Sequence, residues 1–337
     1  MMSKPRACFL TAAGEEGILA AYDSASRSRL SSAFALDDPV YTGIEEIAGD
    51  DVTAIFSTWG MPAPDAVTIA HRLPRLGAVF YAAGSVQNFA RPFLERGIRV
   101  YSAARANAVP VAEYTVAAIL LSNKGFWQSA RYNLAGRRQE AVRLSHAQPG
   151  NYAVRVGIIG AGAIGRLVIE KLTALDAELE IWVFDPFLPA AEAHRLGVRL
   201  VDDLPGLFAS CQVISNHLAN NAETRGMLNA ACFERMSPTA TFINTGRGAQ
   251  VVEADLVAAL RAEPGRFAIL DVTWPEPSDP AGPLHELDNI ILTPHIAGSQ
   301  ANEIWRMGAL MTQAAENWLA GRPSPHEVSL EMLATMA

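Results

Sequence analysis

Short apolar runs alternate along the chain with longer segments in which apolar residues recur at helical spacing. The runs are rich in Val and Ile, as expected of strands buried on both faces. The expected strands are Ala7–Leu10, Thr53–Ser57, Ala78–Tyr81, Arg99–Tyr101, Val154–Ile159, Ile181–Asp185, Gln212–Ser215, Thr241–Asn244, Phe267–Val272 and Asn289–Leu292. Helices are expected between them, for example at Ala112–Lys124, Gly165–Leu175 and Ala254–Leu260. This alternation predicts an α/β protein whose parallel sheets are built from right-handed crossover units.

Two longer helical patterns, Pro110–Ala135 and Gln300–Ala320, flank the middle group of strands. They predict that one domain is inserted into another. We therefore expect two doubly wound, parallel-sheet domains separated by a cleft. The inner domain would span residues 104–298, and the discontinuous outer domain would comprise residues 1–103 and 299–337.

Composition narrows the class of protein. Half of the 337 residues are apolar, 18% are charged and the net charge is −8. This balance fits a globular protein and gives no general attraction to nucleic acid or to a membrane. Cys8, Cys211 and Cys232 show no metal-ligand spacing, so we expect reduced thiols and no metal site. The first residues lack a convincing leader pattern, and Val109–Leu121 is too short and too polar to span a bilayer, so we expect a cytoplasmic protein.

A glycine-rich turn lies between an expected strand and an expected helix. Gly160 would permit the tight turn, Gly162 the close approach of a pyrophosphate, and Gly165 the close packing of helix on strand. The free N–H groups at the start of the helix that follows, expected at Gly165, would bind an anion, and we count Ala163 and Ile164 of the turn among the cofactor-binding residues. The sequence therefore predicts a dinucleotide site. The alternative is a structural turn that binds no cofactor.

Asp185 ends the next expected strand, twenty residues after Gly165, where a carboxylate can accept hydrogen bonds from a ribose diol. Its charge would repel a 2′-phosphate, and Pro186-Phe187-Leu188 supplies no cation to compensate. We therefore expect NAD(H) rather than NADP(H) as the cofactor.

Three motifs in the C-terminal half supply an arginine, a glutamate and a histidine at expected strand ends. Arg247, in Asn244–Gly248, could bind a carboxylate through two hydrogen bonds and polarise a neighbouring carbonyl. His295 could exchange a proton with that carbonyl oxygen, and Glu276 would orient the imidazole and favour its protonated form. Each residue alone also has an ordinary structural interpretation. Their joint position at the carboxyl ends of strands favours a redox site for a small carboxylic acid.

From about Leu76 to Trp318 the chain resembles the D-isomer-specific 2-hydroxyacid dehydrogenases. Arg247 precedes Glu276 by 29 residues and Glu276 precedes His295 by 19, as in that family. The resemblance implies an NAD-binding Rossmann domain inserted into a flavodoxin-like substrate domain, and a homodimer. It also implies catalytic roles for Arg247, Glu276 and His295. Further residues that it assigns to the cofactor are His217, Thr245, Gly246, Asp271, His295 and Gly298, with Asp271 on the nicotinamide amide. Ser85 and Val86 fall in the loop whose backbone N–H groups bind the substrate carboxylate.

Several positions depart from the family pattern. Ala163 stands where an Arg is common, Ser85 and Gln87 replace a Gly and an Asp of the substrate loop, and Gln300 replaces a frequent Thr. Ala219-Asn220-Asn221 replaces a common Pro-Leu-Thr run beside the cofactor. None of these changes removes a catalytic group.

The expected reaction is reversible hydride transfer between NAD(H) and a small D-2-hydroxy acid or its 2-oxo acid, possible substrates being of the glycerate, hydroxypyruvate or glyoxylate type. A phosphoglycerate substrate would need cations for its phosphate, and Tyr81 stands where a basic residue often opens the substrate loop. Because Arg91 and Arg105 lie nearby in sequence, a phosphoglycerate dehydrogenase stays an alternative, as does an NADH-sensing co-regulator without turnover. A formate-type dehydrogenase fits less well, because Thr293-Pro294 replaces the Gln usual before such a histidine.

Overall fold

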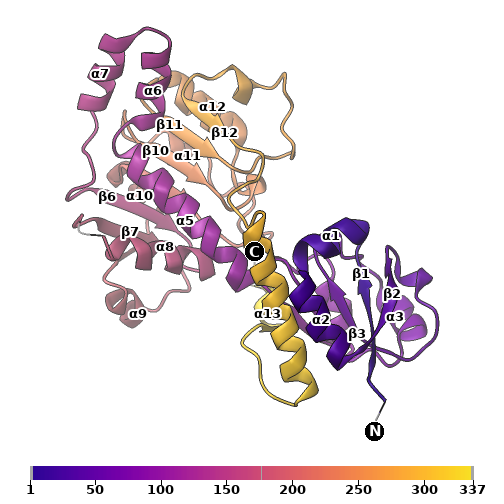
Figure 1. The fold of residues 1–337 in the computed structure, drawn as a ribbon. Coiled ribbons are helices and arrows are strands. Elements are labelled where there is room, and N and C mark those ends of the chain that lie inside the picture. The colour runs from indigo at the N-terminus through magenta and orange to yellow at the C-terminus, as the bar shows by residue number, and fades with distance from the viewer. Residues whose placement is uncertain (1–2, 176, 335–337) are drawn as a thin grey trace. The chain divides into compact units, whose positions relative to one another are not determined.

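The computed structural model describes residues 3–175 and 177–334. They form two compact units, each with its own sheet (Figure 1). The first unit comprises the residues up to Ala108 together with those from Ser299 onward, and the second is Val109–Gly298. Helix α5 (Ala104–Ser122) contains the division between Ala108 and Val109, so it belongs in part to each unit.

The sheet of the first unit has six strands in the order β13-β5-β4-β3-β1-β2. Five are parallel, and β13 pairs with β5 in the antiparallel sense. The order of the five parallel strands is that of flavodoxin-like, doubly wound sheets. The strands are β1 (Arg6–Leu10), β2 (Ala35–Tyr41), β3 (Val52–Ser57), β4 (Ala78–Tyr81), β5 (Arg99–Ser102) and β13 (Glu327–Val328). The helices are α1 (Gly14–Ala21), α2 (Ser24–Ala33), α3 (Ala66–Arg72), α4 (Ala90–Glu95) and α13 (Asn302–Leu319).

Helices cover both faces of this sheet. On one face α1, α2 and α13 supply Ile18, Leu30 and Met311 to an apolar cluster. On the other, α3 and α4 supply Ile69 and Phe93. The central strands β1, β3 and β4 are buried on both sides, which explains their short apolar runs.

The second unit has seven parallel strands in the order β12-β11-β10-β9-β6-β7-β8. This is the Rossmann order with one further strand, and its topological switch lies between β6 and β9. The strands are β6 (Arg155–Ile159), β7 (Glu180–Phe184), β8 (Arg199–Val201), β9 (Val213–Asn216), β10 (Thr241–Asn244), β11 (Phe267–Leu270) and β12 (Ile290–Leu292). The helices beside α5 are α6 (Phe126–Leu134), α7 (Arg138–His146), α8 (Ala163–Thr173), α9 (Ala190–Arg195), α10 (Leu204–Ser210), α11 (Ala230–Phe233) and α12 (Glu253–Ala262).

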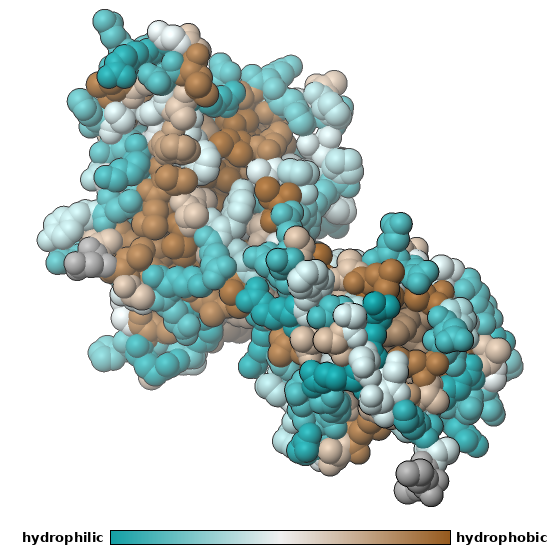
Figure 2. Space-filling model, in the orientation of Figure 1, coloured by the Kyte–Doolittle hydropathy of each residue, from teal (hydrophilic) through white to brown (hydrophobic). Residues whose placement is uncertain are grey.

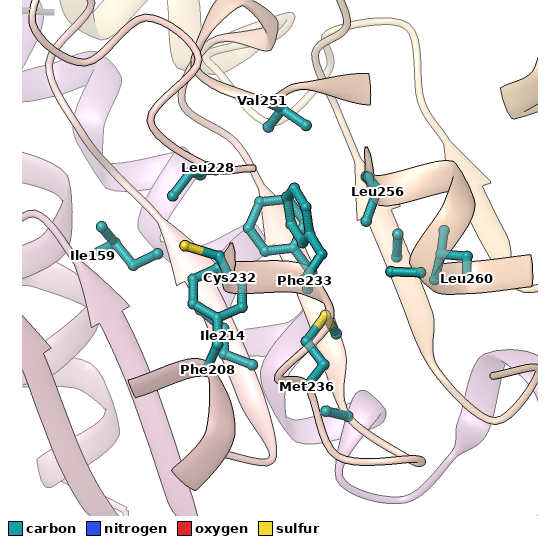
Figure 3. Packing of buried hydrophobic residues seen from close by; sticks show 14 of the residues in the cluster. Ile159, Phe208, Ile214, Leu228, Cys232, Phe233, Met236, Val251, Leu256 and Leu260 are labelled. Atoms are coloured by element: carbon teal, nitrogen blue, oxygen red, sulfur yellow. The ribbon is translucent and has the colours of Figure 1, made fainter. Parts of the chain in front are cut away.

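Two apolar clusters fill the faces of this second sheet. In one, the ring of Phe208 packs edge to face against that of Phe233 (Figure 3). The ring of Phe242 stacks on Phe208 and packs edge to face against Phe233, with 5.2 Å between the ring centroids of Phe233 and Phe242. In the other, α5 and α8 pack Ile119 and Val168 against the strands. The cores therefore hold the carboxyl ends of β6, β9, β10 and β11 in fixed positions, and ligands bind at such ends.

The expected fold of two parallel-sheet α/β domains is confirmed. The expected single helix over Pro110–Ala135 is wrong, because α5 starts earlier, contains Pro110, and ends before Gly125. Gly125 adopts a left-handed φ of 60° and separates α5 from α6. The expectation of parallel strands alone is also incomplete, since β13 is an antiparallel edge strand. No described helix is long and apolar enough to cross a membrane.

Candidate active site

The glycine-rich turn connects β6 to α8 in the second unit. Gly160 has a φ of 89°, and a Cβ there would lie 2.7 Å from the carbonyl oxygen of His217. A Cβ on Gly165 would lie 2.1 Å from the carbonyl oxygen of Gly160. Both positions thus require glycine to close the turn. The expected helix start at Gly165 is wrong, because α8 begins at Ala163.

Gly162 differs from the other two glycines, because a Cβ there would meet no atom of the described residues within 4 Å, apart from its chain neighbours. Packing within the protein therefore does not demand glycine at this position, and a side chain would fill open space in front of α8. The N-cap of this helix is Gly162 itself, and no side chain in the described part of the chain caps it. Its first N–H groups are left for an outside acceptor. These residues fit the pyrophosphate of a dinucleotide.

Asp185 follows β7, which ends one residue before it, at Phe184. One carboxylate oxygen, Oδ2, accepts a hydrogen bond of 2.7 Å from the N–H of Ala161, and the other accepts one of 2.8 Å from the N–H of Phe187. The carboxylate is therefore held against the glycine-rich turn. Each oxygen retains a lone pair for another donor.

His295 and Glu276 form the most direct polar contact of the site. The distance between His295 Nδ1 and Glu276 Oε1 is 2.7 Å, and both side chains are well exposed, at 47% and 39%. The other ring nitrogen, Nε2, makes no hydrogen bond with the described part of the chain. The bond to Glu276 fixes the orientation of the ring and leaves Nε2 for a ligand.

The loop that carries His295 is held by Asp271, just after β11. Asp271 Oδ1 accepts hydrogen bonds from the hydroxyl of Thr293 at 2.7 Å and from the N–H of Ile296 at 2.8 Å, and Oδ2 accepts one from the N–H of Ala297 at 2.9 Å. Tyr114 of α5 contacts Thr293 through its hydroxyl at 3.2 Å. His295 itself has a left-handed φ of 56°, which is uncommon for a histidine. Asp271 thus stabilises a strained loop, a role that the sequence did not reveal. Gly298 lies in the same loop, which continues to the start of α13 at Asn302.

Arg247 lies half-buried after β10. Its Nη1 donates a 2.7 Å hydrogen bond to the carbonyl oxygen of Gly246, and no described carboxylate forms an ion pair with it. Loss of hydration lowers the pKa of Arg247 from its ordinary value, and the nearby carboxylate of Glu276 opposes this effect. The structure therefore brings Arg247, Glu276 and His295 together. The arrangement offers an unpaired cation beside an oriented imidazole.

The close approach of two loops explains this proximity. A Cβ on Gly248 would lie 2.0 Å from the carbonyl carbon of Thr273. Only glycine lets the loop after β10 pack so closely against the segment that leads to Glu276.

His217 follows β9 and is buried, at 8% exposure. Its Nε2 lies 3.0 Å from the hydroxyl of Ser215, and its buried Nδ1 has no partner in the described structure. Burial lowers the pKa of His217 to about 3, so the ring is neutral at ordinary pH. Thr245 is also buried, and its hydroxyl contacts that of Thr115 at 3.3 Å.

Ser85 and Val86 lie in the first unit, in the loop after β4. Val86 is fully buried and Ser85 is partly exposed. Their backbone N–H groups donate to no protein acceptor in the described residues. The hydroxyl of Ser102 donates a 2.6 Å hydrogen bond to the carbonyl oxygen of Gly84 and so restrains the start of this loop. The loop has free donors that fit a carboxylate.

Three buried amides were missed by the sequence reasoning. Asn216, Asn244 and Gln250 have no exposed surface and hydrogen-bond to one another next to Arg247. Asn216 and Asn244 each end an apolar strand, and a polar residue at the end of such a run was the only signal in the sequence.

Comparison with known proteins identifies the family. Residues 116–297 match the family described as D-isomer specific 2-hydroxyacid dehydrogenase, NAD binding domain. The chain is 33% identical over 236 residues to D-3-phosphoglycerate dehydrogenase of Archaeoglobus fulgidus, a match that covers 70% of this chain but 44% of that protein. It is 31% identical over 204 residues to (S)-sulfolactate dehydrogenase of Chromohalobacter salexigens, covering 60% of this chain and 64% of that one. The chain thus spans less than half the length of the phosphoglycerate dehydrogenase.

Solved structures with low sequence identity share the fold. The holo form of Rhodotorula graminis D-mandelate dehydrogenase superposes with a TM-score of 0.82 at 21% identity, covering 97% of this chain and 98% of that one. The NADPH-dependent glyoxylate/hydroxypyruvate reductase of Sinorhizobium meliloti, in complex with NADP and malonate, gives a TM-score of 0.71 at 23% identity, with 97% of each chain covered. The family match covers more than half of this chain and includes the glycine-rich turn, Arg247, Glu276 and His295. The chain therefore belongs to the D-isomer-specific 2-hydroxyacid dehydrogenase family, and its second unit carries the family's NAD-binding domain.

Proposed function

We propose that this protein is an NAD(H)-dependent oxidoreductase that interconverts a small D-2-hydroxy acid and its 2-oxo acid. The observation that supports this most strongly is the half-buried, unpaired Arg247 beside the Glu276–His295 pair. These groups are what the reduction of a 2-oxo acid needs: a cation for the carboxylate and a proton donor for the carbonyl oxygen.

In this proposal Arg247 binds the substrate carboxylate and polarises the C2 carbonyl. His295 donates the proton on Nε2 to the carbonyl oxygen during reduction, or accepts one from the hydroxyl during oxidation. Glu276 keeps the ring oriented through Nδ1, and Asp271 keeps the loop in place. The nicotinamide cofactor, when bound, supplies or accepts the hydride at substrate C2. The assignment of the Ser85 and Val86 N–H groups to the substrate carboxylate is a further part of the proposal.

The cofactor assignment follows the turn after β6. Gly160, Gly162 and Gly165 shape the turn, and Ala163 and Ile164 offer the first N–H groups of α8 to the pyrophosphate. Asp185, His217, Thr245, Gly246 and Gly298 would surround the rest of the cofactor. We propose NAD(H) over NADP(H), because a 2′-phosphate beside the Asp185 carboxylate would place like charges close together.

The proposed substrate class is narrower than the range of acids on which the family acts. We propose an unphosphorylated acid of the glycerate, hydroxypyruvate or glyoxylate type, since Tyr81 is buried where a cation would open the substrate loop. The phosphoglycerate dehydrogenase relatives keep a phosphorylated substrate as the second candidate.

A panel of 2-oxo acids with NADH decides between these candidates. We expect turnover with small unphosphorylated acids and at least tenfold lower kcat/KM with 3-phosphohydroxypyruvate. The reverse order would establish the second candidate. NADH binding without turnover on the whole panel would contradict the enzyme assignment and favour the NADH-sensing co-regulator.

We also propose that two copies associate through α5 and α6. Helix α5 is rich in Ala, Val, Ile and Leu, although it also carries the exposed charges of Arg105 and Glu113. In the view of Figure 2, apolar side chains gather on the second unit over α5 and beside α6, where Phe126 and Leu134 are 45% and 88% exposed. We expect a dimer by light scattering, and replacement of Leu134 by Asp should shift it toward monomer. A wild-type monomer at micromolar concentration would contradict this.

A further inference from the structure

We propose that Gln250 and Asn216 are positioning residues that fix two loops of the site at once. One loop carries Arg247, and the other is Leu218-Ala219, next to His217. For Arg247 the inference rests on the proposed function, whereas for Leu218-Ala219 it concerns NADH binding alone.

Gln250 satisfies its whole hydrogen-bonding capacity inside the protein. Its Oε1 accepts from Asn216 Nδ2 at 2.6 Å and from the N–H of Arg247 at 3.1 Å. Its Nε2 donates to the carbonyl oxygens of Leu218 and Ala219, both at 2.9 Å. The acceptor end of one side chain therefore holds the Arg247 loop, while the donor end holds the other loop.

Asn216 and Asn244 complete the network at the ends of neighbouring strands. Asn216 Nδ2 also donates to Asn244 Oδ1 at 2.9 Å, and Asn216 Oδ1 accepts from the N–H of Leu218 at 3.2 Å. Asn244 Oδ1 accepts from the N–H of Gly246, and its Nδ2 donates to the carbonyl oxygen of Arg247. The three side chains have no exposed surface, so any group that loses its partner cannot turn to water instead.

The packing around this network is tight. A Cβ on Gly246 would lie 2.8 Å from Gln250 Oε1 and 2.9 Å from Asn216 Nδ2. The backbone before Arg247 thus rests directly on the amides, and a shift of Gln250 moves the loop with it.

The second loop needs such support because of its sequence. Ala219 occupies a position at which a proline is common in the family, and a proline ring would restrict the backbone there. In this chain the two hydrogen bonds from Gln250 Nε2 restrain the same backbone. We infer that the amide bridge replaces the missing proline as the restraint.

Two substitutions of Gln250 separate its acceptor and donor ends. Gln250→Met keeps the length of the side chain but loses all four hydrogen bonds. Gln250→Glu keeps the acceptors for Asn216 and Arg247 but, when ionised, cannot donate to Leu218 and Ala219. The matched control is Asn289→Leu, because Asn289 Nδ2 also donates to two buried carbonyls, of Leu260 and Arg266, just before β12 at the opposite end of the sheet.

The experiment measures the NADH Kd by fluorescence titration and the KM for the best 2-oxo acid at saturating NADH. Gln250→Met should raise both constants about tenfold, as expected for buried groups left without partners. Gln250→Glu at alkaline pH should raise the NADH Kd while the KM stays near the wild-type value. Asn289→Leu should lower Tm and leave both constants near wild type.

Wild-type constants in a folded Gln250→Met protein would overturn the proposal. An equal rise of Kd and KM in Gln250→Glu would overturn the division of roles between the two ends. Absence of turnover in the wild-type protein would contradict the proposed function alone, because the NADH titration still tests the Leu218-Ala219 loop.

Discussion

At the scale of single residues, the site depends on charges and amides whose partners lie far away in the sequence. Arg247, Glu276 and His295 could be proposed from their spacing, because each follows an apolar strand. Asn216 and Gln250 could not, because an amide in a sequence does not show which carbonyls surround it. The three hydrogen bonds to the Asp271 carboxylate could not be predicted from the sequence either, because they depend on how the chain turns back after Thr293.

Arg247→Ala should lower kcat/KM for a 2-oxo acid by roughly three decades, because both the carboxylate anchor and the polarising charge are lost. Arg247→Lys should recover only part of this, since an ammonium group cannot form two parallel hydrogen bonds with a carboxylate. Steady-state kinetics with NADH measures both variants. Near-normal kcat/KM in Arg247→Ala would remove Arg247 from the substrate site.

His217 should make the protein less stable as the pH falls. Its pKa in the folded state is about 3, against 6.5 ordinarily, so below pH 6.5 the unfolded chain binds a proton that the folded chain does not. Between pH 7 and pH 5 this difference removes about 2 kcal/mol of unfolding free energy. In His217→Gln, the loss of unfolding free energy between pH 7 and pH 5 should be smaller by this amount. Urea unfolding at both pH values measures it, and an unchanged pH dependence in the variant would contradict the burial of a neutral ring.

At the scale of elements, the sequence predicted the central strands well and the edges poorly. The strands that it missed, β2, β8 and β13, all lie at sheet edges. Strand β2 contains Asp37, Asp38 and Pro39, which a central strand would not tolerate but an edge strand can. An edge strand has one paired side and need not be apolar on both faces. The pattern of buried runs therefore could not reveal these strands.

The break between α5 and α6 has a similar cause. A helical pattern continues through Lys124 and Gly125, and only the left-handed φ of Gly125 shows that the chain turns there. Pro110 caused the error at the other end of the helix. A proline was expected near the helix start, but α5 begins at Ala104 and contains Pro110.

The loop after β12 should depend on Asp271. Asp271→Asn replaces one acceptor oxygen by an amide that cannot accept from a backbone N–H, so at least one loop bond is lost. We expect kcat to fall by about tenfold or more, as for the loss of a hydrogen bond to a charged group. Thr58, in the first unit, is a control: Thr58→Val removes a buried hydroxyl that bonds the carbonyl oxygen of Ala82. A wild-type kcat in Asp271→Asn would show that the loop holds His295 without this carboxylate.

At the scale of the whole molecule, two sheets with different strand orders are joined through α5 and the chain at Gly298-Ser299. The second sheet carries the glycine-rich turn Gly160–Gly165 at its topological switch. Dinucleotide binding should therefore stabilise that unit, by about 2.7 kcal/mol at a concentration of one hundred times Kd.

The preference between the two dinucleotides tests the role of Asp185 in that unit. NADH should raise the unfolding temperature more than NADPH at equal concentration, because the 2′-phosphate would face the Asp185 carboxylate. Asp185→Ala should reduce the rise in unfolding temperature caused by NADH. It should also narrow the difference between the rises caused by NADH and by NADPH. Scanning calorimetry with each cofactor measures this. An equal or larger shift with NADPH would place Asp185 away from the ribose.

The central claim is that His295 transfers the proton while the cofactor exchanges a hydride. The most direct measurement compares the wild-type protein with His295→Ala, following NADH absorbance with a 2-oxo acid and NADH binding by fluorescence. We expect His295→Ala to lose turnover by about two to four decades, the usual contribution of a general acid, while its NADH Kd stays near the wild-type value. Turnover in His295→Ala comparable to that of the wild-type protein would contradict the account.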